Sequence, residues 1–264
     1  LNHISVRNDD GVAYLNAMSP VDCIFLDPAR RNEHGGKTVA ISDCEPNVAE
    51  LEGLLLSKAN RIMIKLSPML DLSQALKELP HTQEVHIISV NNECKELLLL
   101  LGQTAPEEIP VHCVNLSTKG EQEKQLFVFT REQEQHSECS YTDTLGNYLY
   151  EPNASLLKAG AFRSIAVAYS VKKLHPNSHL YTSETQIEGF PGRTFRIINR
   201  CSLNKKEIKE NLSDLKKANI TVRNFPATVA ELRKRIKLAE GGDTYLFAST
   251  LNDGQKILIR CGKV

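Results

Sequence analysis

The sequence lacks the cysteine spacing that would indicate a metal site or a disulfide-stabilised fold. It contains seven cysteines, an odd number, and none of them forms a Cys-x-x-Cys pair. Two of them, Cys23 and Cys113, lie within apolar runs that are typical of strands. Cysteines of this kind favour reduced thiols in a cytoplasm over disulfides or a zinc site. We therefore expect a cytoplasmic protein without a structural metal.

Long hydrophobic runs are also missing. The longest apolar stretch, around Leu97–Leu101, is far shorter than the roughly 20 residues that a transmembrane helix needs. The polar segment that follows Leu1 does not have the pattern of a signal peptide. We expect no membrane partner. Hydrophobic residues make up 41% and charged residues 24% of the 264 positions, which is typical of a globular protein with one large or two medium-sized domains.

The chain as a whole has no excess of either charge, since its formal net charge is zero. The charge is nevertheless uneven, because residues 183–264 carry 16 Lys and Arg against 9 Asp and Glu. A basic segment of this kind is attracted to polyanions such as nucleic acids. The alternative is a set of helices with ordinary solvated, charged faces.

Hydrophobic periodicity predicts an α/β protein. In the first half, strands that alternate with helices favour βαβ units and a parallel sheet. The expected strands are residues 3–7, 21–26, 61–66, 84–90, 111–116 and 125–130, and the expected helices are 11–18, 47–57, 71–79 and 92–101. In the second half we expect helices at 154–171, 204–217 and 228–238, strands at 194–198 and 220–223, and a terminal hairpin of 244–251 with 256–261.

One stretch, VDCIFLDPARR from Val21 to Arg31, combines a buried-strand pattern with polar groups at its end. In open α/β sheets, ligands bind beyond the carboxyl ends of the strands, which is where Asp27 falls. Pro28 fixes its own φ angle and stiffens the turn that presents Asp27. Arg30 and Arg31 can donate bidentate hydrogen bonds to phosphates or carboxylates, unless they are merely solvated or paired within the protein. The sequence therefore predicts a functional carboxylate at Asp27, with turn capping as the alternative.

Several strings of the sequence carry a family resemblance. IFLDPARR resembles the fourth motif of class I S-adenosylmethionine-dependent methyltransferases, in which a strand ends in Asp-Pro-Pro. Asn8-Asp9-Asp10 resembles the acidic motif that contacts the adenine in those enzymes. IKLSPMLD and SVNNECKELL resemble a bacterial branch with a THUMP-like C-terminal domain, and NKKEIKENLSDLKKANITVRNFP and AELRKRIKLAEGGDTYLF resemble that domain.

The resemblance implies a fold, a cofactor and a partner. The fold would be the later part of a Rossmann-like sheet (residues 1–135), a connecting helical segment (136–182) and a small α/β THUMP-like, RNA-binding domain (183–264). The cofactor would be S-adenosylmethionine and the partner RNA. The implied catalytic residues are Asp27 and Pro28, and the implied cofactor-binding residues are Asp9, Asp10 and Asp27. Lys65, at a strand end beside Ser67, is a further catalytic candidate from its position alone. The candidate substrate- or RNA-binding residues are Arg30, Arg31, Lys205, Lys206, Lys209, Arg223, Arg233, Lys234 and Arg235.

The N-terminal part of the chain differs from the family pattern. None of its 14 glycines forms a Gly-x-Gly loop after a strand, so we expect this chain to be the later part of a longer protein. In the family's sheet, the third strand is separated from the fourth by the first two. Residues 3–7, as that third strand, would therefore need a companion fragment or stay unpaired. We expect the chain to bind the cofactor poorly by itself.

The catalytic motif also departs from the two best-known chemistries. Ala29-Arg30 stands where enzymes that methylate exocyclic nitrogens have a stacking aromatic residue, and Lys65-Leu66-Ser67-Pro68 contains no cysteine for attack on a pyrimidine ring. The methyl acceptor therefore stays open. A non-catalytic RNA-binding protein on a methyltransferase-like scaffold is the alternative, and a small-molecule methyltransferase would leave the basic segment unexplained.

Several of the acidic and amide residues have a structural interpretation. Asp9 or Asp10 can be the N-cap of the helix that follows, as can Asp71, with Gln74 three residues later. Asn153 is expected to cap the helix that begins at Ala154, and Glu151 beside it is a weaker candidate for a carboxylate that faces the substrate.

Overall fold

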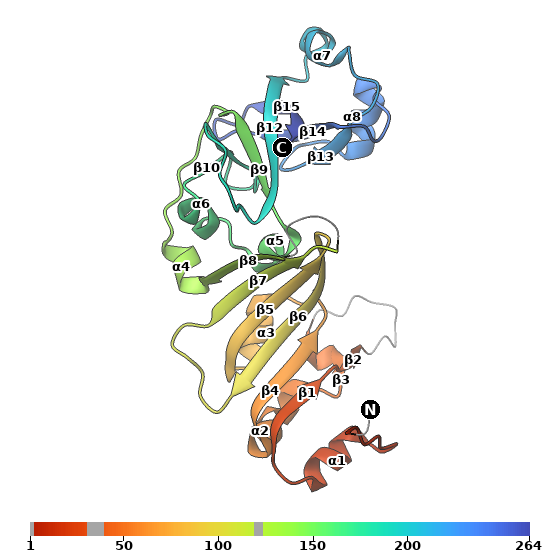
Figure 1. The fold of residues 1–264 in the computed structure, drawn as a ribbon, viewed down its shortest axis with the longest axis vertical. Helices are drawn as coiled ribbons and strands as arrows, with labels where there is room; N and C mark the ends of the chain where they lie inside the picture. The colour runs from red at the N-terminus through yellow and green to blue at the C-terminus, as the bar shows by residue number, and fades with distance from the viewer. Residues whose placement is uncertain (1–2, 31–39, 119–123) are drawn as a thin grey trace. The chain divides into compact units, whose positions relative to one another are not determined.

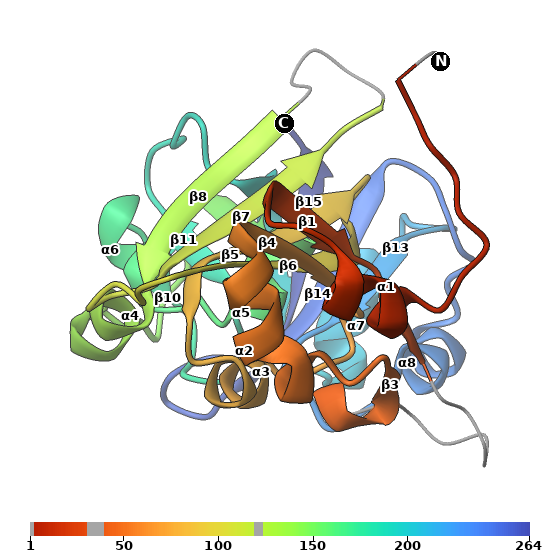
Figure 2. The ribbon, with the colours of Figure 1, turned by 90° about the horizontal axis from the view of Figure 1, so that it is seen from below.

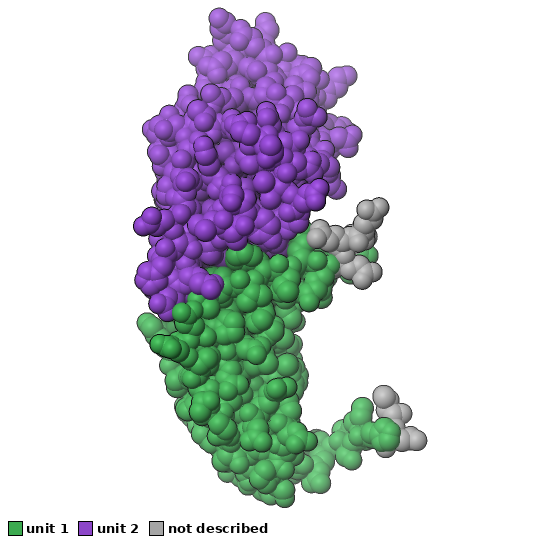
Figure 3. Space-filling view, turned by 60° about the vertical axis from the view of Figure 1, so that its left-hand side comes forward, with its two compact units in different colours: residues 1–131 green, residues 132–264 purple. Residues whose placement is uncertain are grey.

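The computed structural model describes residues 3–30, 40–118 and 124–264. The chain forms two compact units, Leu1–Arg131 and Glu132–Val264 (Figure 3), each built around its own sheet. The expected connecting segment, residues 136–182, is not a separate part, because it supplies strands to the sheet of the second unit. None of the described helices has the length and apolarity needed to cross a lipid bilayer.

The first unit contains a mixed, six-stranded sheet with the strand order β1-β4-β6-β5-β7-β8 (Figure 1). Its strands are β1 (Val21–Leu26), β4 (Ala59–Leu66), β5 (Thr82–Val90), β6 (Glu93–Gly102), β7 (Pro110–Leu116) and β8 (Lys124–Thr130). The pairs β1–β4 and β5–β7 are parallel, whereas β6 and β8 run antiparallel to their neighbours. The expectation of a parallel sheet therefore holds for only part of it.

The predicted helix at residues 92–101 was wrong, because these residues form β6. Asn91 and Asn92 have φ angles of 51° and 64°, and they close a two-residue turn between the paired residues Val90 and Glu93. Positive φ at both central residues is the geometry of the type I′ hairpin turn, which asparagine tolerates. The run of five leucines hides the strand period of two, which appears only as the alternation of fully and partly buried side chains along Leu97–Leu101.

Helices cover one face of this sheet. These are α2 (Val48–Lys58) and α3 (Leu72–Glu78), which lie on the same side (Figure 2). Fully buried residues of β4 and β5 form the core of the unit, among them Ile62, Ile64, Val85 and Ile87. The remaining short elements are α1 (Gly11–Ala17), β2 (Ala29–Arg30), η1 (Ile41–Asp43) and β3 (Cys44–Glu45).

The strand expected at residues 3–7 does not form: residues 4–8 have no regular secondary structure. β1 is an edge strand, with β4 as its only partner among the described residues. An edge strand has backbone N–H and C=O groups without ladder partners. Of the two alternatives expected for residues 3–7, a companion fragment or no pairing, the described residues show no pairing within this chain.

The second unit contains a seven-stranded sheet with the order β10-β11-β9-β12-β15-β14-β13. Its strands are β9 (Tyr148–Pro152), β10 (Lys172–Lys173), β11 (Tyr181–Ser183), β12 (Gly192–Cys201), β13 (Asn219–Val222), β14 (Thr244–Thr250) and β15 (Lys256–Lys263). Its helices are α5 (Ala154–Ala159), α6 (Ser164–Ala168), α7 (Lys205–Leu212) and α8 (Val229–Ile236), and α4 (Arg131–His136) begins at the boundary between the units.

The helix expected at residues 154–171 is interrupted. Gly160 ends α5 with a φ of 79°, the left-handed conformation that commonly terminates helices. α6 then begins at Ser164. The predicted terminal hairpin is confirmed as β14 and β15, which pair antiparallel.

The second sheet is buried on both faces at β14. Alternate residues of β14 enter two different clusters: Phe247 packs with Leu149 and Phe195 in the first, and Leu246 with Leu212 and Leu232 in the second. Helices α7 and α8 supply Leu212 and Leu232, so they cover the second face. Continuous apolar runs in β14 and β15 are what a doubly covered sheet requires.

Candidate functional site

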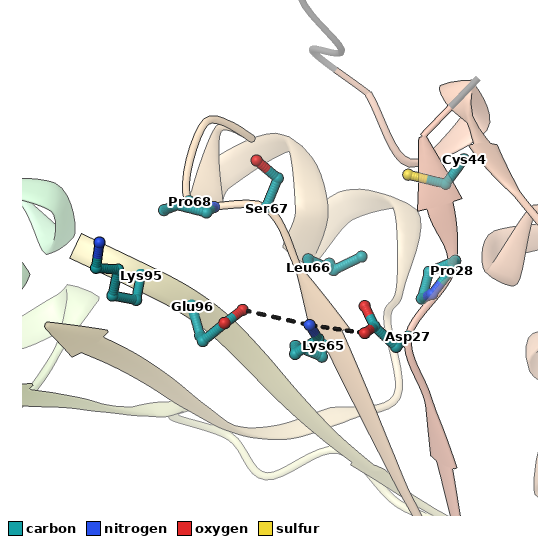
Figure 4. Close-up of a pocket in the computed structure, with 9 residues that line it drawn as sticks. All are labelled: Asp27, Pro28, Cys44, Lys65, Leu66, Ser67, Pro68, Lys95 and Glu96. Atoms are coloured by element: carbon teal, nitrogen blue, oxygen red, sulfur yellow. Dashed lines mark ion pairs between the residues drawn. The ribbon is translucent and has the colours of Figure 1, made fainter. Parts of the chain in front are cut away.

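The predicted residues Asp27, Pro28 and Lys65 line one pocket in the first unit (Figure 4). Asp27 follows β1 and Lys65 lies at the end of β4, and these two strands are parallel neighbours. Their carboxyl ends therefore meet at the same edge of the sheet, where ligands bind in open α/β folds. The pocket is completed by Cys44, Leu66, Ser67, Pro68, Lys95 and Glu96.

Lys65 lies between two carboxylates. Its ammonium nitrogen is 2.7 Å from Oδ2 of Asp27 and 3.8 Å from Oε2 of Glu96 (Figure 4). The hydrogen bond to Asp27 raises the pKa of Lys65 above its ordinary value, and the charge of Glu96 adds to this, while desolvation opposes it. Lys65 is therefore a cation at neutral pH. It can orient Asp27 or attract negative charge, but it is not a general base.

The pocket is small for a cofactor. Its volume is about 190 Å³, whereas sites that bury drug-sized ligands measure roughly 300–1,000 Å³. The side chain of Asp27 is 54% exposed, so its carboxylate reaches solvent even while it pairs with Lys65. The pocket can therefore hold a small polar part of a ligand beside the carboxylate of Asp27 and the ammonium of Lys65.

Pro28 is buried under this pocket, and the two arginines beyond it differ in what the structure describes. Ala29 and Arg30 form the short strand β2, which pairs with Glu45 and Cys44 of β3. This pairing begins directly after Pro28. Arg31 lies outside the described residues.

The predicted acidic residues Asp9 and Asp10 do not line the pocket. Asp10 is the N-cap of α1: its Oδ1 accepts a hydrogen bond of 2.7 Å from the backbone N–H of Ala13. Asp9 accepts one of 2.9 Å from the N–H of Asp10. The capping interpretation is therefore confirmed for Asp10, and both side chains are exposed at the start of α1.

The predicted RNA-binding residues of α7 and α8 fall into two groups. Lys205, Lys206, Lys209 and Lys234 are exposed, and Lys206 has only a distant pair with Glu210, at 4.0 Å. The arginines are used internally: Arg233 donates to the carbonyl of Ala218 at 3.3 Å, and Arg235 to that of Leu203 at 3.0 Å. The lysines are therefore the more available groups for a polyanion.

Arg223 is held in an ion-pair cluster inside the second unit. Its guanidinium donates to Oε1 of Glu151 at 2.9 Å, and Arg193 donates to Oε2 of the same carboxylate. Only 2% of the Glu151 side chain is exposed. The proposal that Glu151 faces a substrate was therefore wrong, since both of its oxygens are occupied within the protein. Asn153 is the N-cap of α5, as expected, and accepts from the N–H of Leu156.

Glu96, which pairs with Lys65, is among the pocket residues that sequence reasoning missed. It lies in β6, which pairs antiparallel with β4, so that the beginning of β6 meets the end of β4 beside Lys65. The expected helix at 92–101 placed Glu96 elsewhere. The signal was present in Asn91-Asn92, which is a favoured hairpin turn pair once the flanking apolar runs are taken as strands.

The chain is similar to two protein families and to a solved structure. Residues 148–191 match a family described as a ferredoxin-like domain, and residues 192–263 match one described as THUMP domain-like. The crystal structure of a putative methyltransferase from Porphyromonas gingivalis W83 is 40% identical to this chain and superposes with a TM-score of 0.83 over 92% of it. The chain spans 60% of the length of that protein. No curated protein matches the chain.

Proposed function

We propose that this chain is part of an S-adenosylmethionine-dependent methyltransferase that acts on RNA. The observation that carries the proposal is the Asp27–Lys65 pair, which lies at the joint carboxyl ends of two parallel strands. The similarity to a protein described as a putative methyltransferase supports the reaction class. The THUMP-like domain at 192–263 and the exposed lysines of α7 support RNA as the substrate.

Methyl transfer needs alignment of donor and acceptor more than it needs covalent help from the protein. Asp27 is the group proposed to orient the acceptor or to take up its proton. Lys65 holds the carboxylate of Asp27 in place, because their contact is a charge-assisted hydrogen bond of 2.7 Å. Pro28 fixes the turn that carries Asp27.

The cofactor is proposed to extend beyond the pocket of this chain. S-adenosylmethionine is a drug-sized ligand, and the pocket volume of about 190 Å³ accommodates only part of it. Asp9, Asp10 and Asp27 remain the proposed contacts of this chain with the cofactor. A glycine-rich loop for its amino-acid and ribose ends is proposed to belong to the complete gene product, outside residues 1–264.

Asp27→Asn is expected to reduce methyl transfer by at least about 100-fold, because it removes the carboxylate that general base catalysis or orientation requires. The measurement is transfer of labelled methyl groups from S-adenosylmethionine to RNA by the complete gene product. Asp22→Asn is the matched control, since Asp22 is an exposed carboxylate on the same strand and does not line the pocket. Equal activity of the two variants would refute the role of Asp27.

Removing two of the exposed lysines of α7, by Lys205→Gln and Lys209→Gln, is expected to weaken RNA binding and to lower its salt dependence. Each lysine that neutralises a phosphate adds to the slope of log K against log salt, so removing two such lysines reduces the slope by about 1.5. Lys256→Gln with Lys263→Gln removes the same charge from exposed positions on β15 and serves as control. An unchanged slope in the α7 variant would exclude this helix from the interface.

One observation favours a second candidate, a non-catalytic RNA-binding protein. Ala29 follows the Asp27-Pro28 turn, where a stacking aromatic residue would be expected for exocyclic-nitrogen methylation. Titration calorimetry with S-adenosylmethionine on the complete gene product separates the two candidates. Binding that Asp27→Ala weakens supports the enzyme, whereas no binding together with intact RNA affinity supports the non-catalytic protein.

A further inference from the structure

A second group of chemically competent side chains lies on the sheet of the first unit, outside the Asp27–Lys65 pocket. Glu84 and His86 belong to β5 and His112 belongs to β7, and each offers one ligand atom within 4.8 Å of the other two. We propose that these three residues bind a divalent transition-metal ion, and that zinc is the ion that fits their donors best. The absence of a Cys-x-x-Cys pattern does not argue against such a site, because no thiol is needed.

The strand geometry brings these residues together. Glu84 and His86 are two residues apart on β5, and side chains at this spacing point to the same face of a sheet. β5 pairs with β6 along one edge and with β7 along the other. In the parallel β5–β7 pair, His86 and His112 stand directly opposite each other. The site therefore depends on a contact between segments that β6 separates in the sequence.

The donor atoms already converge on one point. Nε2 of His86 is 3.1 Å and Nε2 of His112 is 3.9 Å from the same oxygen of Glu84, Oε2. The two rings are stacked, with centroids 4.4 Å apart and an angle of 7° between their planes. Ligands about 2.0–2.1 Å from a tetrahedral zinc ion are roughly 3.4 Å from one another. Ligation by all three groups requires rotation of the two imidazole rings out of their parallel stack, so that both Nε2 lone pairs point at one ion.

The donor set and its surroundings suit zinc. Imidazole nitrogens with a carboxylate oxygen bind zinc well, and hard ions such as magnesium and calcium prefer oxygen ligands alone. The side chains of His86 and His112 are 27% and 26% exposed, so the ion would be partly shielded from water. Apolar register partners flank the three residues on neighbouring strands: Leu98, Leu100 and Val128.

A metal ion would also use the ligand atoms of all three residues of this cluster at once. Two histidines approach one oxygen of Glu84, and each ring can donate through Nε2 only in one tautomer or when protonated. A divalent ion would accept one lone pair from each of the three groups, Glu84, His86 and His112.

Three protein ligands leave a coordination position for water or a substrate oxygen. The register places Lys65, Leu98, His86 and His112 in one row across β4, β6, β5 and β7. Because neighbouring strands are about 4.8 Å apart, the backbone of His86 is about 10 Å from that of Lys65. The ion would therefore lie on the same face of the sheet as Lys65. Its binding does not depend on the proposed methyl transfer.

The experiment removes bound metal from the chain with a chelator and then titrates it with zinc chloride in a calorimeter, which measures the heat of binding. One equivalent is expected to bind, and His86→Ala and His112→Ala are each expected to weaken binding by at least tenfold, since loss of even an outer partner of a ligand costs about 10–100-fold. Glu84→Gln keeps the shape of the side chain and is expected to weaken binding as well. Circular dichroism of each variant verifies that the chain stays folded.

The matched control is His136→Ala. His136 is an exposed histidine 3.9 Å from Glu132, so it resembles the cluster, but residues 3–30, 40–118 and 124–264 supply no third donor there. It is expected to leave zinc binding unchanged. Cobalt substitution gives a second readout: a spectrum without sulfur-to-cobalt charge transfer supports the histidine–glutamate site, and such a band would assign the ion to cysteines. Zinc affinity that survives His86→Ala and His112→Ala would overturn the proposal.

Discussion

Replacing Glu151 by glutamine is expected to lower the free energy of unfolding of the second unit by about 3 kcal/mol. The side chain is 2% exposed, and its two oxygens pair with Arg193 and Arg223. Glutamine retains the shape but removes the negative charge, which leaves two guanidiniums beside each other. The loss stands at the lower end of the range for a broken buried pair, since the arginine side chains are 43% and 35% exposed and water can reach them.

Urea denaturation followed by circular dichroism measures this change. Glu210→Gln is the matched control: Glu210 is 58% exposed and lies 4.0 Å from Lys206. A pair of this kind contributes at most a few tenths of a kcal/mol, so the control should unfold like the parent chain. If Glu151→Gln impaired methyl transfer while stability stayed constant, the interpretation of Glu151 as a substrate-facing carboxylate would have to be restored.

Features that depend on neighbouring residues in the sequence, such as helix caps and strand ends, were predicted well. Asp71 accepts a hydrogen bond of 2.9 Å from the N–H of Gln74, and Asn153 one of 3.2 Å from that of Leu156, as their cap positions implied. A cap depends on residues within one helical turn, so its signal is contained in a few positions. The position of β1 was also predicted well, since the strand ends directly before Asp27, but the burial expected from its apolar run was wrong: Val21 is 43% and Phe25 57% exposed, because β1 lies at the edge of the sheet.

Elements that depend on distant partners were predicted less well. Residues 92–101 became a strand because β4 and β5 were both available as neighbours, and the leucine run fits either period. Residues 3–7 match a strand pattern, yet among the described residues they pair with no strand. Propensity alone does not decide between helix and strand when tertiary contacts complete the pattern.

The candidate site also contains residues whose proximity the sequence indicated and residues whose proximity depends on the strand order. The proximity of Asp27 and Lys65 follows from two strand ends in a parallel pair, which the sequence pattern indicated separately for each strand. Glu96 and the Glu84–His86–His112 cluster require the strand order β4-β6-β5-β7, in which sequence neighbours are not always spatial neighbours. A single sequence contains no signal for that order, apart from the Asn91-Asn92 turn that joins β5 to β6.

The second large effect is expected from Leu149→Ala, which should destabilise residues 148–263 as one body. Leu149 is fully buried, and truncating a leucine in such a position costs about 2–5 kcal/mol. It belongs to β9, within the ferredoxin-like segment, but it packs in one cluster with Phe195 and Phe247 of the THUMP-like segment. The cavity therefore opens in a core that both segments share.

The boundary between the two segments also runs through a continuous sheet. β9 pairs antiparallel with β12, and Gly192 at the start of β12 stands opposite Pro152. A side chain at Gly192 would collide with the backbone carbonyl of Glu151, so the two strands meet as closely as glycine allows. Strands that share a hydrogen-bond ladder and a hydrophobic core are expected to unfold cooperatively, because unfolding of one strand exposes backbone groups and core side chains of the other to water.

Hydrogen exchange followed by mass spectrometry tests this expectation. In Leu149→Ala, amides of β14 and β15 should lose protection as much as those of β9, although the substitution lies in the other segment. Val167→Ala is the control: Val167 is 50% exposed in the ferredoxin-like segment, so its truncation should change stability by less than about 0.5 kcal/mol. Loss of protection limited to residues 148–191 would mean that the two segments are separate folding units, and that the sheet between them is a contact surface rather than a common core.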